Sequence, residues 1–237
     1  MKTGKRILFL SLALLINADL FSAPADTTSI IDNIYNYDFN KATERLSLLN
    51  EKNPFISEAL NLEIKWWMSV ENRNKNQFSD FLSTLNQFEN SDKNELSDII
   101  FLTYRMRYYA CTNKQYMIPF LFLKIQNQIS KVDITLLQSS TQDGYELFVL
   151  YKSFLTLVQN RFFNNFFLSD NGKKMALINN IEHIANYGSS SNRTIGSYFL
   201  MKYYLEIEKD KSKAFSYLTV LHKQYPNNLI FTQLLTN

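Results

Sequence analysis

Two stretches of this chain, DFNKATERLSLLNEKNP at 38–54 and DKSKAFSYLTVLHKQYP at 210–226, share a pattern of residues at identical spacing. The shared positions are Asp38, Lys41, Ala42, Leu46, Leu49 and Pro54 in the first copy and Asp210, Lys213, Ala214, Leu218, Leu221 and Pro226 in the second. The alanine permits two helices to cross closely, the leucines follow one and two turns later, and the proline ends the helix. We therefore expect a helix of the same kind near each end of the chain.

The pattern resembles the second helix of a tetratricopeptide repeat (TPR), a helical hairpin that stacks with its neighbours into a solenoid. In the later copy the preceding helix also fits, because Tyr198, Met201 and Leu205 stand where the family places large packing residues, although Lys202 replaces the usual glycine. The resemblance covers 195–228 and 30–54 and weakens between them. With its Asn-, Lys-, Phe- and Tyr-rich composition, the chain is similar to exported TPR proteins of the Bacteroidetes. The resemblance implies an all-α, right-handed, TPR-like α-solenoid.

Apolar residues recur at helical spacing through the rest of the chain, which has only three prolines and four glycines after residue 25. Breaks in this spacing are expected at 71–75, 90–94, 112–113, 131–141, 169–172 and 188–192. They favour about five antiparallel helix hairpins followed by a short C-terminal capping helix at 228–235. Asp38 is expected to cap the second helix. No break is long enough to separate domains, so we expect one helical repeat domain over 26–237.

Residues 1–25 have the features of a secretory signal peptide. Lys2, Lys5 and Arg6 precede an apolar run at 7–16, which is too short to span a bilayer. Ala23-Pro24-Ala25 supplies the small residues of a cleavage site, which places the mature start near Asp26. No cysteine lies near this site, so we expect a soluble periplasmic or extracellular protein rather than a lipoprotein. The alternative is an uncleaved anchor or a buried helix at 7–16.

Charge and cysteine content exclude some classes of function and fold. Removing residues 1–25, which hold three basic residues and Asp19, leaves 22 Lys and Arg against 21 Asp and Glu. A nearly neutral chain without a basic stripe is not typical of nucleic-acid binding. The single cysteine, Cys111, cannot form an internal disulfide, so stability must come from the apolar core. We expect no nucleic-acid partner and no membrane span after signal cleavage.

Residues that could carry enzymatic chemistry are sparse. His183 and His222 are far apart, and neither has a second His, Cys or Glu at metal-ligand spacing. The chain contains no nucleophile-elbow motif, no P-loop and no glycine-rich turn. Cys111 follows a hydrophobic helical run, where a free cysteine is usually part of the core. We therefore expect a non-catalytic protein without a metal or other cofactor.

Aromatic residues are the main candidates for binding. Trp66 and Trp67 are adjacent, so on a helix they point about 100° apart and only one can readily face the core centre. We expect Trp66 to lie on a groove wall. A second aromatic-rich segment at 145–167 is expected to form the buried centre of the bundle, and the alternative is an exposed patch for a partner.

In the TPR family, partners lie on the concave surface formed by the first helix of each hairpin. Carried over to this sequence, that face would present Phe199, Tyr203 and Glu206, with Ile31 and Tyr35 as counterparts in the first repeat. Such a surface suits a peptide with apolar anchors. The alternative is that Phe199 and Tyr203 pack on the neighbouring hairpin.

Three hypotheses about function follow. The first is a non-catalytic scaffold or adaptor of the cell envelope that binds another protein or peptide on its concave face. The second is a small-molecule or glycan-binding protein with an aromatic-lined pocket, which would need convergent polar groups. The third is a structural homo-oligomer joined through the terminal repeats, because an uncapped solenoid end exposes apolar surface.

Overall fold

A computed structural model describes residues 24–50, 54–72, 75–90, 95–112, 114–133, 142–162 and 171–236. These residues form eleven α-helices, one short 3₁₀-helix and one π-helix, and they contain no strand. The α-helices are α1 (Pro24–Tyr35), α2 (Phe39–Asn50), α3 (Pro54–Asn72), α4 (Lys75–Glu89), α5 (Glu95–Cys111), α6 (Ile118–Ile129), α8 (Gln142–Phe162), α9 (Asn171–Tyr187), α10 (Ser190–Lys202), α11 (Lys211–Gln224) and α12 (Leu229–Thr236). The 3₁₀-helix η2 is Gln115–Met117, and the π-helix η3 is Tyr203–Glu208. The expected all-α class is confirmed.

The two matching stretches of sequence form matching helix starts. Tyr37 and Lys209 both have a φ of 61°, which is the left-handed conformation that ends one helix and turns the chain toward the next. The aspartate that follows each of them begins the second helix. Asp210 accepts a hydrogen bond from the backbone nitrogen of Lys213 at 3.1 Å, and Asp38 accepts one from that of Lys41 at 3.4 Å. The predicted cap at Asp38 is confirmed, and Asp210 repeats it.

The residues expected to pack inside the two hairpins are mostly buried. Ala42 and Ala214 lie in the core of their hairpins, as do the two leucines of each motif, Leu46 and Leu49 in α2 and Leu218 and Leu221 in α11. In α10, Tyr198 and Met201 are buried, and Leu205 in η3 is partly buried. The two prolines differ in position, because Pro54 is the first residue of α3 whereas Pro226 lies in the turn between α11 and α12.

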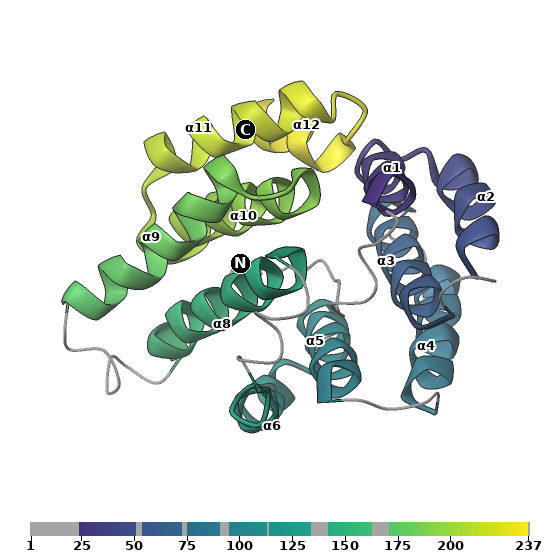
Figure 1. Cartoon of the computed structure of the whole chain (residues 1–237), viewed down its shortest axis with the longest axis horizontal. Helices are drawn as coiled ribbons and strands as arrows, with labels where there is room; N and C mark the ends of the chain where they lie inside the picture. The colour runs from purple at the N-terminus through teal and green to yellow at the C-terminus, as the bar shows by residue number, and fades with distance from the viewer. Residues whose placement is uncertain are drawn as a thin grey trace, which may run out of the picture.

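Successive helices pack side by side along an arc, with α1 to α4 at one end and α8 to α12 at the other (Figure 1). Helices α5 and α6 lie between these two groups at the lower edge of the view. The first and last parts of the arc also meet, because α1 contacts α10. In an open solenoid each repeat contacts only its neighbours. This arrangement is instead closed, since the first hairpin packs against the last.

The closure contact, as we name it, consists of Asp32 and Tyr35 of α1 with Tyr225, Asn228 and Phe231 at the C-terminal end. The Tyr225 hydroxyl donates to Asp32 Oδ1 at 2.9 Å, and Asn228 Nδ2 donates to the Tyr35 carbonyl at 2.8 Å. The Tyr35 ring lies 5.3 Å from that of Tyr225 and 6.4 Å from that of Phe231. All three rings are buried, so the closure contact is part of the main core.

Candidate functional site

Most of the side chains expected on the concave face lie in the core. Ile31, Tyr35, Trp66, Phe199 and Tyr203 are all less than 5 % exposed. These residues are therefore not available to a partner in this structure, and the alternative, packing on a neighbouring hairpin, is what is found.

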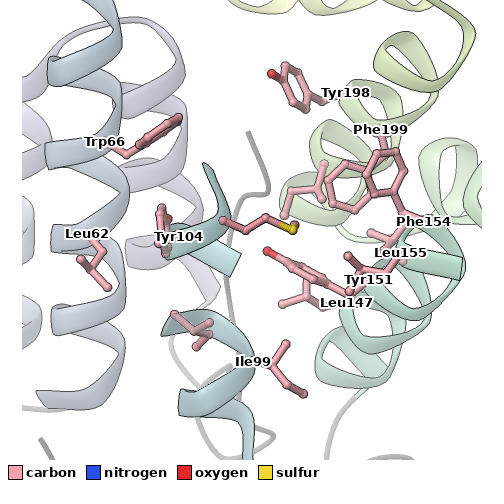
Figure 2. Packing of buried hydrophobic residues seen from close by; sticks show 14 of the residues in the cluster. Leu62, Trp66, Ile99, Tyr104, Leu147, Tyr151, Phe154, Leu155, Tyr198 and Phe199 are labelled. Atoms are coloured by element: carbon pink, nitrogen blue, oxygen red, sulfur yellow. The ribbon is translucent and has the colours of Figure 1, made fainter. Parts of the chain in front are cut away.

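The burial follows from the position of α10, the helix expected to line the concave face. It packs against α8, α9 and α11 and is also contacted by α1. The Phe199 ring stacks on that of Phe154 of α8 at 4.4 Å, and the Tyr151 ring meets it edge-on. Figure 2 shows these side chains of α8 and α10 turned toward the same interior as Trp66 and Tyr104 of α3 and α5. The face that would be concave in an open solenoid is thus filled with side chains.

The expectation that Trp66 lies on a groove wall was wrong, because both tryptophans are buried. The Arg107 guanidinium covers the Trp66 ring at 5.3 Å, and Phe81 of α4 meets its edge at 5.4 Å. On the other side of α3, the Trp67 ring packs against Tyr35 at 5.3 Å. Helix α3 is therefore enclosed on two sides, and each tryptophan has its own neighbours.

A buried ion pair, which the sequence analysis did not identify, lies at the centre of these contacts. Arg107 Nη1 of α5 donates to Glu63 Oε2 of α3 at 3.1 Å, and both side chains are almost completely inaccessible to solvent. Trp67 Nε1 donates to Glu63 Oε1 at 2.8 Å, and the Tyr104 hydroxyl donates to Glu63 Oε2. The guanidinium also lies 4.6 Å from the Tyr104 ring centre. A charge at this depth must be paired and hydrogen-bonded, and Glu63 meets both conditions.

Protonation states around this pair follow from its surroundings. Desolvation is the largest single effect on the pKa of Arg107 and lowers it, but Glu63, Tyr104 and Tyr151 together raise it by more. The pKa is therefore raised and the guanidinium stays charged. Burial and the negative charge of Glu63 raise the pKa of Tyr104 well above its usual value, so its hydroxyl remains a donor. The cluster thus holds α3 against α5 through one ion pair and three hydrogen bonds to Glu63.

The remaining predicted candidate, Glu206, lies in the π-helix η3, which continues directly from α10. It is half-buried, and it accepts a hydrogen bond from Lys202 Nζ at 2.9 Å. Lys202, which stands where the TPR resemblance would place a glycine, is itself buried, and its ammonium lies 5.9 Å from the Tyr198 ring centre. The ion pair with Glu206 and the contact with Tyr198 explain how a lysine is accommodated at this position.

The π-helix also places tyrosines and charged residues together at its junction with α9 and α11. We call the set formed by Glu182, Tyr204, Tyr217, Lys213, Lys174 and Glu208 the tyrosine–carboxylate surface. The rings of Tyr204 and Tyr217 are almost parallel, at 3° and 6.1 Å, and both hydroxyls donate to Glu182 Oε1, at 3.4 and 3.2 Å respectively. The Lys213 ammonium lies 5.0 Å from the centre of the Tyr204 ring. π-Helical turns occur frequently at functional sites.

Three members of this surface, Tyr204, Tyr217 and Glu208, have shifted pKa values. Desolvation and the Glu182 charge raise the pKa of Tyr204 to about 12, and the same causes raise the pKa of Tyr217. Desolvation acts to raise the pKa of Glu208, but hydrogen bonds from Lys174 Nζ and the Tyr203 hydroxyl, each at 2.7 Å, lower it overall. Tyr204 is itself buried, whereas Tyr217 and the charged residues of this surface are partly or well exposed to solvent. The surface can therefore offer hydrogen bonds, charge and aromatic area to a bound molecule.

Within the ranges that the structure covers, no group of three or more His, Cys, Asp or Glu side chains is arranged to hold a metal ion. None of the helices in those ranges is both long and apolar enough to cross a membrane.

Cys111 is exposed at the last residue of α5, so the expectation that it belongs to the core was wrong. His183 is exposed on α9, as expected for a helix-surface residue.

The predicted signal peptide falls almost wholly on residues 1–23, outside the described part of the chain. Comparison of the chain with protein-family models, with curated proteins and with solved structures finds no match.

Proposed function

We propose that this protein is a non-catalytic adaptor of the cell envelope, built from TPR-like helical hairpins and exported by its N-terminal signal peptide. The support for TPR-like hairpins is the agreement between the two motif copies, which share the left-handed residue, the aspartate cap and the buried alanine. The support for export is the arrangement of basic residues, apolar run and small residues at 1–25.

The partner, in this proposal, is another protein, and it binds the tyrosine–carboxylate surface instead of the filled concave side. The observation that carries this choice is the pair of parallel tyrosine rings whose hydroxyls converge on Glu182. Tyr204 is buried, so the ring that a partner would contact is that of Tyr217, which Tyr204 and Glu182 hold in place. Binding there would therefore cost little side-chain entropy. Tyrosine is also among the residues that contribute most to protein interfaces. Lys174 and Lys213 add positive charge beside the carboxylates, which suits a partner surface of mixed charge.

A small molecule, in particular a glycan, is the second candidate ligand for the same surface. A tyrosine ring beside a carboxylate offers one apolar face and one acceptor, which are the two features that a sugar ring with hydroxyl groups can use. A protein partner would bury a larger area than a small molecule, because it would also contact side chains around the surface.

The experiment that tests the proposal is in-cell crosslinking with a C-terminal affinity tag, followed by mass spectrometry of the captured proteins. The variants are Tyr217→Ala and Glu182→Gln, and the matched control is Tyr187→Ala, a 77 % exposed tyrosine on α9 outside the surface. We expect one or two exported proteins to be captured by the wild type and by the control and to be lost with both surface variants.

Equal capture by all four proteins would refute the assignment of the surface. If no protein is captured, binding to a glycan array that is lost with Tyr217→Ala would support the second candidate in place of the first. Light scattering at several concentrations separates both from self-assembly, because only a homo-oligomer changes mass with its own concentration.

A further inference from the structure

Helix α6 and the 3₁₀-helix η2 before it carry a group of exposed apolar side chains. Tyr116 is 70 % exposed, Phe120 62 % and Leu123 54 %. Elsewhere in the described residues, large exposed apolar side chains occur singly or far apart along a helix, as with Leu48 on α2 and Val220 on α11. The group on η2 and α6 is therefore a local concentration, which is the arrangement that marks an interaction surface.

The spacing of these residues places them on one side of the helix. At about 100° per residue, positions 116, 120 and 123 fall within one narrow stripe. The buried residues of α6 fall on the opposite side, and they are Ile118, Leu121, Phe122, Ile125 and Ile129. The inner side packs against α5, and α6 lies at the periphery of the molecule (Figure 1). A surface helix of a globular protein needs only one apolar side, so the second one requires its own explanation.

The charges around the stripe are all of one sign along η2 and α6. Lys114 precedes η2, Lys124 lies beside Leu123, and Lys131 follows α6, and all three are exposed. The sequence from Ile99 to Val132 contains no acidic residue. On the neighbouring α5, Asp98 accepts a hydrogen bond from Gln128 at 2.9 Å, and Asp133 lies beyond the end of α6.

We propose that this outer side of α6, formed by Tyr116, Phe120 and Leu123 with Lys114, Lys124 and Lys131, binds the surface of an anionic phospholipid bilayer. The helix lies parallel to the membrane, with Phe120 and Leu123 below the level of the headgroups and Tyr116 among them. The lysines extend their apolar stems along the helix and bring their ammonium groups to lipid phosphates.

Charge complementarity decides in favour of lipid over a second copy of this chain. A symmetric contact between two α6 helices would bring the same lysine-bearing surface of each copy together without carboxylates from either helix to offset them. An anionic bilayer supplies both the apolar interior and the negative charge that the stripe and the lysines require. The inference is independent of the proposed adaptor function, because it uses a different surface.

The test is sedimentation of the exported, processed protein with vesicles of phosphatidylcholine alone and with vesicles containing phosphatidylglycerol. We expect binding to the anionic vesicles, weaker binding to the neutral ones, and a loss of binding as salt is added. Phe120→Ser/Leu123→Ser should weaken partition by at least about tenfold, because two buried apolar side chains are removed. Neutralising all three lysines, as Lys114→Gln/Lys124→Gln/Lys131→Gln, should weaken it by about tenfold to a hundredfold.

The matched control is Leu48→Ser/Val220→Ser, which removes two exposed apolar side chains of similar exposure, 69 % and 55 %, from other helices. This control should bind as the wild type does, and all variants should keep their helicity because the replaced side chains are exposed. Absence of binding to anionic vesicles, or equal weakening by the control, would overturn the proposal. A drop in molecular mass of Phe120→Ser/Leu123→Ser in light scattering would also overturn it, because the stripe would then be a contact between copies.

Discussion

Replacing Arg107 by methionine should cost more stability than any surface substitution on the same helix. Glu63 is only 2 % exposed and accepts from Arg107, Trp67 and Tyr104, so the change leaves a buried carboxylate with two neutral donors. Removing one partner of such a pair costs about 3–5 kcal/mol in free energy of unfolding. For a chain of this length, each kcal/mol shifts the melting temperature by about 2–4 °C, so the expected decrease is about 6–20 °C.

The measurement is urea unfolding followed by circular dichroism, with Arg105→Met as the matched control. Arg105 lies two residues away on α5 and pairs with Glu89 at 3.6 Å, but both side chains are 37 % exposed, so this pair should contribute at most about 1 kcal/mol. The double variant Glu63→Gln/Arg107→Met should be more stable than Arg107→Met alone. If Arg107→Met lowers the free energy of unfolding no more than Arg105→Met does, the buried ion pair does not stabilise the fold as we infer.

Three further predictions concern the C-terminal hairpin and the closure contact. Ala214→Leu should overpack the helix crossing and cost about 1–3 kcal/mol, while Ser216→Leu, an exposed position on the same helix, should leave the melting temperature almost unchanged; equal effects would argue against close packing at Ala214. Tyr225→Phe removes the hydroxyl that donates to Asp32, so it should lower the free energy of unfolding by about 1–3 kcal/mol and speed amide hydrogen exchange in α1. Unchanged exchange in α1 would contradict the role of the closure contact. The pKa of Glu208 is lowered in the folded state, so its ionised carboxylate stabilises the fold above the usual carboxyl pKa, and this stabilisation is lost as the pH falls through the folded-state pKa. Glu208→Gln should therefore reduce the fall in free energy of unfolding on the acid side of the pH–stability curve. An unchanged slope there would refute this role of Glu208.

The local structure of this protein could be predicted from its sequence because it depends on neighbours in the chain. The breaks at 71–75, 90–94 and 188–192 fall where α3, α4 and α9 end and the next helices begin. The capping helix expected at 228–235 is found as α12. In these cases a few residues, such as an aspartate cap or a short polar run, determine where a helix starts or stops.

The candidate binding residues were misplaced because their burial depends on contacts between distant segments. Tyr35 and Phe199 have the spacing of exposed first-helix residues in an open solenoid. The C-terminal turn covers Tyr35, and Phe154 and Tyr151 of α8 cover Phe199. Helical periodicity gives the side of a helix on which a residue lies and does not give what covers that side. Glu63 offered a sequence signal that was overlooked, since it lies one turn before Trp67 in an apolar stripe, where a carboxylate needs a buried partner.

The closure contact also determines the order in which the protein can finish folding. Its hydrogen bond from Tyr225 to Asp32 joins residues 193 positions apart, so the first helix cannot bury Tyr35 until the last hairpin has been made. A chain that emerges from its N-terminus onward can pack α1 against α2 and α3 early. The part of Tyr35 that Tyr225 and Phe231 cover stays exposed until the last residues appear. The packing of the first helix is thus completed only by the last residues, which makes the Tyr35 side of α1 the expected site for chaperone binding during synthesis.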